Sequence, residues 1–398
     1  MQSPSTLLIR CIRSELGQYS LADLFSEDEL AFLVSDETAR AVFAAASPQD
    51  LSHIPAAVFC KLQSRISDAM FASVKKVRFQ TAFRCEQITH ETQAVSGLFC
   101  ASGIPHIPLK GAFIRPYYPS PDMRTSCDVD ILVSTDDLRK AENALTEKLG
   151  YTKIRDGGHD VQFSSPTGVL LELHFTLMDE KDYPRISAVL SRVWENVRPS
   201  DEGSYKMVMS PSFAYFYHIA HMVKHYLYGG CGIRTLMDLW IFNHRIPGFD
   251  RGDAAELLAE AGILRFEEKV YSLAEMWFSG AECDFDDREL LSQMEEYIVS
   301  GGIYGSVENK LKLNRLDNPD QGAYLRSRLF PPFERMKYEY PVLQKHKILL
   351  PFCYLKRWGR LLSKNTAKKV SLELKHNSEL TPEGQDKFRQ MLTDLGLK

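Results

Sequence analysis

The sequence of 398 residues has no long apolar run. No stretch approaches the ~20 consecutive apolar residues that a membrane-spanning helix needs. A short apolar run lies near the first residue, but Arg10 and Arg13 interrupt it, which is not the pattern of a signal peptide. We therefore expect a cytoplasmic protein without a membrane partner.

Cysteines at metal-binding or redox spacing are also missing. The eight cysteines are scattered along the chain, and no C-x-x-C occurs. Most stand in apolar segments, such as Cys60 and Cys100. This pattern favours free, buried thiols in a reducing compartment.

Several common catalytic motifs are absent. The chain has no GxxxxGK[ST], no GxGxxG and no nucleophile-elbow motif, so a P-loop NTPase, a Rossmann dehydrogenase and a serine hydrolase are not supported. A basic surplus is missing too, because 48 Lys and Arg stand against 52 Asp and Glu, for a net charge of −4. The template groove of a nucleic-acid polymerase usually needs such a surplus, so nucleic acid is not an expected partner.

What the chain does contain is a strand-like run, DVDILV, at residues 128–133. Side chains alternate along a strand, so Asp128 and Asp130 share one face while Val129 and Ile131 point into the core. Two neighbouring carboxylates repel each other and raise each other's pKa, and a cation between them removes that cost. Oxygen ligands of this kind suit Mg²⁺.

Three further features lie around this run. Lys110 and Gly111 end a preceding apolar segment, and Arg124 stands four residues before Asp128. A later strand-like run, VLLELHFTL, puts Glu172 and His174 on one face. The alternative is that these are ordinary exposed carboxylates and surface ion pairs, for example of Lys110 or Arg124 with a nearby aspartate.

Taken in order, these residues form the pattern L-K-G…R…D-x-D…E-L-H. With it the chain resembles the DNA-polymerase-β-like nucleotidyltransferase superfamily, and within it a bacterial family of uncharacterised nucleotidyltransferases. The superfamily usually has Gly-Ser or Gly-Gly where this chain has Lys110-Gly111. The core resemblance covers residues 103–177, and weaker similarity extends through the helix near His218 and to residues 329–332.

The resemblance implies an enzyme that moves a nucleoside monophosphate from an NTP to an acceptor hydroxyl on a small molecule or a protein, releasing pyrophosphate. Asp128, Asp130 and Glu172 would be catalytic and would hold two Mg²⁺ ions, with Mn²⁺ as the alternative ion. The predicted nucleotide-binding residues are Lys110, Gly111, Arg124 and Arg234. Two other readings stay open: a non-catalytic nucleotide-binding or assembly protein that keeps the fold, and a toxin or toxin partner.

The periodicity predicts an α+β protein with a small mixed sheet between two helical regions. The predicted parts are an N-terminal helical region at 1–102, a nucleotidyltransferase core at 103–200 and a C-terminal helical domain at 201–398. Strands are expected at 104–109, 128–133, 151–155, 160–165 and 168–177. One long helical stretch, from about residue 56 to 100, is expected to lead into the core.

Three histidines follow one helix face at residues 218, 221 and 225. Because His218 and His225 are seven residues apart, they stand ~10.5 Å apart along a helix axis, so the three cannot share one ion. Either these imidazoles are packed and hydrogen-bonded, or they face the nucleotide cleft with Lys224, Arg234 or Asp238.

Overall fold

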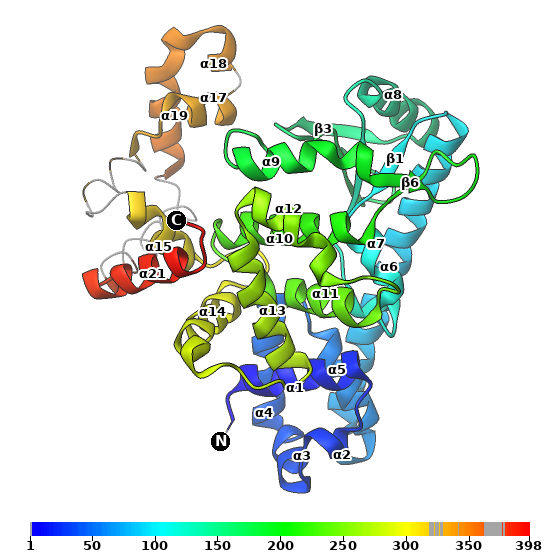
Figure 1. Cartoon of the computed structure of the whole chain (residues 1–398), viewed down its shortest axis with the longest axis vertical. Coiled ribbons are helices and arrows are strands. Elements are labelled where there is room, and N and C mark those ends of the chain that lie inside the picture. The colour runs from blue at the N-terminus through cyan, green and yellow to red at the C-terminus, as the bar shows by residue number, and fades with distance from the viewer. Residues whose placement is uncertain are drawn as a thin grey trace.

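The computed structural model describes residues 2–317, 322, 326, 329–340, 342–361, 376 and 379–398. Within these residues, a mixed sheet of five strands follows the N-terminal helices along the chain and precedes a larger set of C-terminal helices. In space, part of the C-terminal set lies between the sheet and the first N-terminal helices (Figure 1). This arrangement confirms the predicted α+β class. No described helix is both long and apolar enough to cross a membrane.

Short helices form the N-terminal part, where serines at the N-caps begin most of them. The side chain of Ser26 accepts a hydrogen bond from the Glu29 amide, and the Glu29 carboxylate accepts one from the Ser26 amide, which is a capping box. The helices are α1 (Pro4–Gly17), α2 (Leu21–Leu24), α3 (Glu27–Leu33), α4 (Asp36–Ala46) and α5 (His53–Lys61).

The long helix α6 (Asp68–Ala101) leads into the sheet. The prediction of one helical stretch over residues 56–100 is wrong at its start, because α5 ends at Lys61 and α6 begins only at Asp68. Ile66 is extended between them, and the hydroxyl of Ser67 accepts a hydrogen bond from the Met70 amide. A serine in this position begins a new helix, since it pairs an amide that has no partner within the helix.

The sheet has the strand order β1-β2-β5-β4-β3. Strands β2 and β5 are parallel, and the other neighbouring pairs are antiparallel. The strands are β1 (His106–Pro108), β2 (Asp128–Val133), β3 (Thr152–Asp156), β4 (Asp160–Ser164) and β5 (Leu170–His174). The parallel pairing of β2 and β5 matters most, because it joins the two segments that carry the predicted acids.

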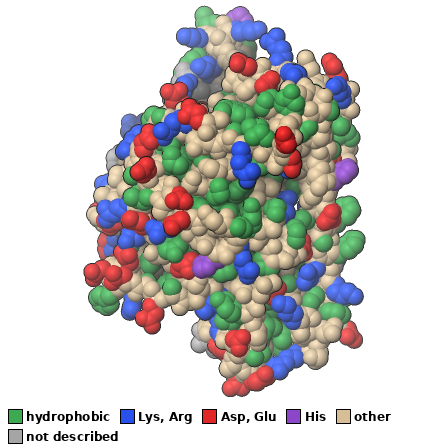
Figure 2. All heavy atoms as spheres, turned by 45° about the vertical axis from the view of Figure 1, so that its right-hand side comes forward, with side chains coloured by type: hydrophobic (Ala, Val, Ile, Leu, Met, Phe, Trp, Pro, Cys, Tyr) green, Lys and Arg blue, Asp and Glu red, His purple; other side chains and the backbone are tan. Residues whose placement is uncertain are grey.

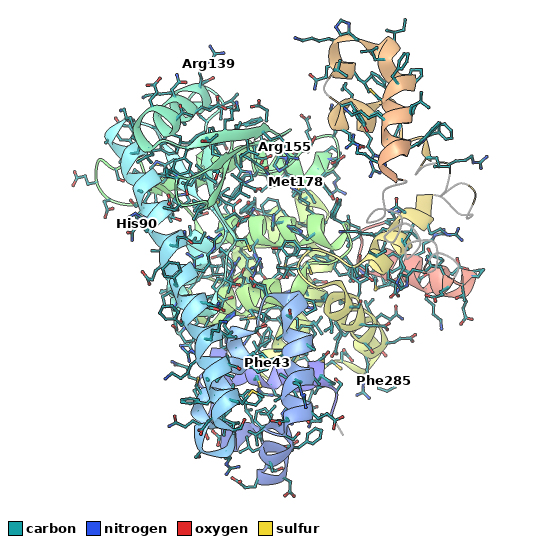
Figure 3. The ribbon with its side chains drawn as sticks, turned by 180° about the vertical axis from the view of Figure 1, so that it is seen from behind. Phe43, His90, Arg139, Arg155, Met178 and Phe285 are labelled. Atoms are coloured by element: carbon teal, nitrogen blue, oxygen red, sulfur yellow. The ribbon has the colours of Figure 1, made fainter. Side chains whose placement is uncertain are left out.

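The two faces of the sheet differ in chemistry. One face packs against α6 and α8 (Leu138–Leu149) through alternating apolar residues of β2, β4 and β5: Val129, Ile131, Val133, Val161, Phe163, Leu171 and Leu173. Seen from behind, Arg139 and His90 mark the outer side of these helices, whereas Arg155 of β3 lies toward the C-terminal helices (Figure 3). The polar side chains of the same strands therefore point to the opposite face, toward the C-terminal helices.

The C-terminal part is helical apart from the small hairpin of β6 (Val197–Pro199) and β7 (Met207–Met209). Helices α10 and α11 cover the polar face of the sheet, and Gly229 and Gly230 separate them. The described helices are α9 (Pro184–Leu190), α10 (Pro211–Tyr226), α11 (Gly232–Arg245), α12 (Ala255–Ala261), α13 (Leu264–Phe278), α14 (Arg288–Gly301), α15 (Val307–Asp317), α17 (Phe333–Glu339), α18 (Val342–Lys345), α19 (Leu350–Leu361) and α21 (Pro382–Asp394).

The surface carries charges of both signs. On the face shown in Figure 2, the described basic and acidic side chains are interspersed among apolar ones and do not gather into a field of one sign. This distribution agrees with the nearly balanced composition of the chain.

Candidate metal and nucleotide site

Strand pairing brings the predicted acids together on the polar face of the sheet. In the parallel register of β2 and β5, Asp130 lies opposite Glu172, and Asp128 lies opposite Leu170. Both acids of β2 and Glu172 of β5 occupy the strand positions that alternate with the buried core residues. The prediction that Asp128 and Asp130 share one face, and that Glu172 and His174 share one face, is confirmed.

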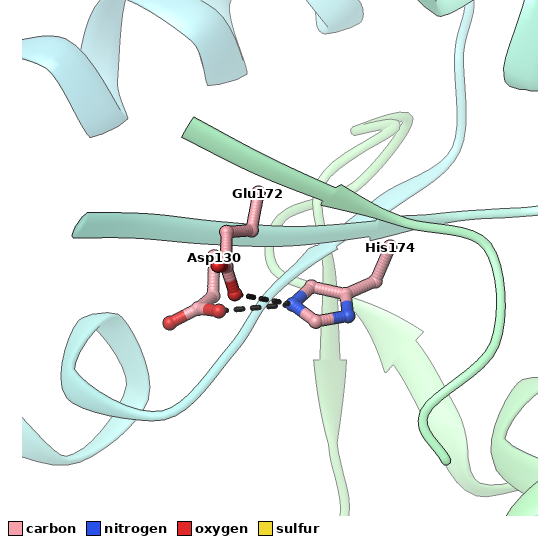
Figure 4. Close-up of side chains that lie close together, drawn as sticks. All are labelled: Asp130, Glu172 and His174. Carbon is pink, nitrogen blue, oxygen red and sulfur yellow. Dashed lines mark hydrogen bonds and ion pairs between the residues drawn. The ribbon is translucent and has the colours of Figure 1, made fainter. Parts of the chain in front are cut away.

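A compact group of possible metal ligands forms there. One ligand atom each from Asp130, Glu172 and His174 lies within 4.8 Å of the other two. His174 Nε2 lies 2.9 Å from Asp130 Oδ1 and 3.7 Å from Glu172 Oε2 (Figure 4). Gln162 of β4 donates from Nε2 to Glu172 Oε1 at 3.0 Å. The predicted metal ligands were Asp128, Asp130 and Glu172. The group in the structure contains His174 instead of Asp128, which lies next to the group on β2.

The electrostatics of this acid cluster, Asp128, Asp130, Glu172 and His174, favour a further cation. Burial and the negative charge of Asp130 raise the pKa of Asp128 and that of Glu172. Burial alone would raise the pKa of Asp130 as well, but Lys110 and His174 hold it below its usual range. Asp130 is therefore neutralised within the protein, whereas its two carboxylate neighbours are not.

The donors fit a divalent ion that prefers oxygen. Carboxylates suit Mg²⁺ and Mn²⁺, and Mg²⁺ commonly takes one or two of them together with substrate phosphates. The Nδ1 atom of His174 is buried and has no hydrogen-bond partner within the described residues. This histidine is thus held by its Nε2 contacts with the two carboxylates, which fix the ring beside the possible ion position.

Lys110 and Gly111 approach the acid cluster from the end of β1. The Lys110 ammonium donates to Asp130 Oδ1 at 2.7 Å, and Lys110 has a backbone φ of 49°, which is rare for a residue with a side chain. Strain of this kind concentrates at functional sites. A Cβ atom on Gly111 would lie 2.6 Å from the Ser126 hydroxyl oxygen, so the close approach of these two segments requires glycine.

Arg124 lies in a second buried cluster. Its Nε donates to both carboxylate oxygens of Asp238 in α11, at 2.8 and 3.0 Å, and the Tyr118 hydroxyl donates to the same carboxylate at 2.6 Å. Burial would raise the pKa of Asp238, but Arg124, His218 and Tyr118 hold it below its usual range. Sequence reasoning named Asp238 only as a cleft residue and missed its pairing with Arg124. A contact of Arg124 with phosphate stays a prediction.

Arg234 is less completely paired than Arg124. Its Nη1 donates to the Thr125 carbonyl at 3.1 Å and lies 3.7 Å from an Asp50 carboxylate oxygen. Its Nε atom is buried and has no hydrogen-bond partner among the described residues. Arg234 lines the cleft, and its buried Nε is a donor that the described residues leave unused.

The three histidines of α10 make different contacts. His218 donates from Nε2 to the Thr235 carbonyl at 2.9 Å, which ties α10 to α11. The Nε2 atoms of His221 and His225 lie 3.1 Å apart. Lys224, on the same helix, lies 3.3 Å from His159 Nε2, at the turn before β4.

One large cleft, with a volume of about 2210 Å³, is lined by the acid cluster, by Lys110, Gly111, Arg124, Arg234 and Asp238, and by the three histidines of α10. The polar face of the sheet forms one wall, and α10, α11 and the segment from Ile303 to Asn314 form the other.

A family model described as an uncharacterised nucleotidyltransferase matches residues 37–279, which are 243 of the 398 residues. The chain belongs to this nucleotidyltransferase family.

The family match includes the whole sheet and the acid cluster. It begins in α4 and ends after α13, so it reaches on both sides beyond residues 103–177, which the core resemblance covers. It stops before residues 329–332, where weaker similarity was expected. Neither a curated protein nor a solved structure matches the chain.

Proposed function

We propose that this member of the nucleotidyltransferase family transfers a nucleoside monophosphate from an NTP to an acceptor hydroxyl on a small molecule or a protein. The observation that carries the proposal is the register of β2 and β5, which puts Asp130 opposite Glu172 in the wall of the cleft. Membership of the family supports the reaction class.

Each cluster has a part in this reaction. Asp128, Asp130 and Glu172 are the ligands we assign to Mg²⁺, with Mn²⁺ as the alternative ion. When bound, such ions neutralise phosphate charge and make the acceptor hydroxyl more acidic. His174 holds the Asp130 carboxylate in position by its 2.9 Å contact.

The nucleotide would bind between the end of β1 and α11. Lys110 carries an ammonium beside Asp130, within reach of a phosphate oxygen held at that carboxylate. Arg234 has unused donor capacity on the cleft wall and is the second phosphate ligand we assign. Arg124 is paired with Asp238, so in this proposal it shapes the loop that precedes Asp128.

The transfer step balances without a further reactant. The acceptor hydroxyl oxygen forms a bond to the α-phosphorus, and the bond from that phosphorus to the α,β-bridging oxygen breaks. Pyrophosphate leaves with the bonding electrons, and the hydroxyl proton passes to the Glu172 carboxylate. Glu172 stands opposite Asp130 in the wall of the cleft, a place from which a carboxylate can accept the proton of a bound acceptor.

The variant Glu172→Gln distinguishes the proposed enzyme from a non-catalytic nucleotide-binding protein. It keeps the side-chain volume and removes the charge, so turnover should fall on the order of 10²–10⁴-fold. Affinity for Mg²⁺–NTP should change far less, because Lys110, Arg234 and the aspartates of β2 remain. Pyrophosphate release gives turnover, and calorimetry on the same preparation gives binding.

The acceptor can be sought with labelled nucleotides. Label from [α-³²P]NTP should enter a product in an acceptor screen, whereas label from [γ-³²P]NTP should leave with pyrophosphate. A wild-type protein that binds NTP but releases no pyrophosphate with any acceptor would favour the nucleotide-binding protein. Transfer of the γ-label would contradict the proposed bond cleavage.

A further inference from the structure

Two exposed tyrosines line the cleft. The side chain of Tyr228 is 69% exposed and that of Tyr304 is 70% exposed, and both line the cleft that contains the acid cluster. Single exposed aromatic residues are common on protein surfaces. This pair differs from such residues in two respects. Both tyrosines line the cleft of the acid cluster, and glycines constrain the two loops that carry them.

The loops that carry the tyrosines contact each other backbone to backbone. Tyr228 follows α10 and precedes Gly229-Gly230, and Tyr304 lies between α14 and α15. A Cβ atom on Gly230 would lie 2.9 Å from the Cα atom of Gly301, and one on Gly305 would lie 3.0 Å from the carbonyl carbon of Gly229.

The same loops require glycine for a second reason. Gly229 has a φ of +113°, Gly302 of +58° and Gly305 of +75°, which residues with side chains rarely adopt. The Ile303 amide also donates to the Pro48 carbonyl at 3.2 Å, which anchors the second loop to the N-terminal helices. The backbone that carries both tyrosines is therefore tightly constrained.

Contacts connect the tyrosines to the predicted phosphate site. The Tyr304 hydroxyl lies 3.5 Å from the Cys127 sulfur, one residue before Asp128. Arg234 donates to the Thr125 carbonyl, two residues earlier in the same segment. Lys310 Nζ lies 5.1 Å from the centre of the Tyr228 ring and donates to the Tyr304 carbonyl at 2.9 Å. These contacts join the loops of both tyrosines to the segment that precedes Asp128 and to Arg234.

We propose that Tyr228 and Tyr304 form a stacking platform for the base of the incoming nucleotide. The inference rests on the proposed function and adds the position of the base and the range of bases accepted. Stacking on an aromatic ring tolerates any base, because each base has a π-face. The platform therefore accepts all four NTPs, and purines bind more tightly because they offer a larger face.

The test compares ATP with inorganic triphosphate, which lacks the base. Binding is measured by calorimetry with Mg²⁺ for the wild type, Tyr304→Leu, Tyr228→Leu and the double variant. Loss of one stacking ring should weaken ATP binding by about 5- to 150-fold, which corresponds to about 1–3 kcal/mol. Triphosphate affinity should stay within about twofold, because the residues assigned to the phosphates are unchanged.

Two controls make the result specific. Tyr304→Phe keeps the ring and should keep ATP affinity. Phe79→Leu removes a 72% exposed ring on α6, outside the residues that line this cleft, and should change neither affinity.

Leucine variants that bind ATP as tightly as the wild type would overturn the platform while leaving the proposed function intact. Equal losses for ATP and triphosphate would overturn it too, because the change would then affect the phosphate site. A wild-type protein that binds neither ligand would overturn the proposed function and the platform together.

Discussion

The cleft contains two buried charge clusters that differ in how completely they are neutralised. In the arginine cluster, Arg124, Asp238 and Tyr118 satisfy one another, and the pKa of Asp238 is held low against burial. In the acid cluster, burial and repulsion from Asp130 raise the pKa of Asp128 and Glu172. The charges of the first cluster are paired within the protein, whereas Asp128 and Glu172 in the second keep raised pKa values, which is why we propose a bound cation there.

This difference separates structural from functional roles for residues that look alike in the sequence. Both clusters contain aspartates on regular elements, and both adjoin the segment from Arg124 to Asp128. A buried charge pair is strongly destabilised when one partner is removed. A repelled carboxylate is not, because its charge already opposes folding. Substitution should therefore affect stability in one cluster and activity in the other.

The largest expected effect is on turnover in Asp128→Asn. Loss of a metal-binding carboxylate removes several kcal/mol of charge stabilisation in the transition state, so the rate should fall on the order of 10²–10⁴-fold. The free energy of unfolding without metal should stay the same or rise. Pyrophosphate release and urea denaturation measure the two quantities. Asp136→Asn, at an exposed acid just after β2, is the matched control and should change neither.

Asp238→Asn should have the opposite result. The substitution keeps the shape but leaves the buried Arg124 guanidinium without its counter-charge, so the free energy of unfolding should fall by about 3–5 kcal/mol. Urea denaturation measures this loss. The double variant with Arg124→Gln should recover part of it, since no charge is then left unpaired. A single variant as stable as the wild type would mean that the pair does not hold the fold.

The arginine cluster should also make the free energy of unfolding depend on pH. Because the folded state holds the pKa of Asp238 below its ordinary 3.8, the unfolded chain binds more protons in this range. The contribution of Asp238 is thus complete above pH 3.8 and is lost as the pH falls through the folded pKa. The difference in stability between wild type and Asp238→Asn should narrow below pH 3.8. A difference that stays constant down to pH 2.5 would contradict the pairing.

Tyr118→Phe should give the smallest effect. It removes one buried hydrogen bond to a charged carboxylate and leaves the ion pair intact. Such bonds contribute about 1.5–3 kcal/mol, so the free energy of unfolding should fall by less than in Asp238→Asn. Thermal and urea denaturation of the two variants side by side check the order. If Tyr118→Phe lost more unfolding free energy than Asp238→Asn, the hydroxyl and not the ion pair would contribute most to the stability of the cluster.

Much of the acid cluster could be predicted because it depends on local rules. Alternation along a strand puts Asp128 and Asp130 on one face and Glu172 and His174 on one face, whatever the rest of the fold is. The parallel pairing of these two strands is added by the structure. A local rule also accounts for the end of α8, where Gly150 adopts the left-handed conformation that glycine favours.

The partners across long sequence distances could not be predicted. Arg124 and Asp238 are 114 residues apart, and no local pattern links a residue before β2 to one side of α11. His174 was expected on the same strand face as Glu172, yet its shorter contact is with Asp130 on the neighbouring strand. The tyrosine platform depends on two glycine loops that meet only in the folded chain.

The central claim is that the acid cluster binds divalent ions and that the arginine cluster does not. The direct measurement is the number of Mn²⁺ ions bound per chain, from an electron paramagnetic resonance titration with a non-hydrolysable NTP analogue. We predict two ions for the wild type and for Tyr118→Phe, and fewer for Asp128→Asn. A wild type that binds no Mn²⁺, or an Asp128→Asn variant that binds as many ions as the wild type, would contradict the account.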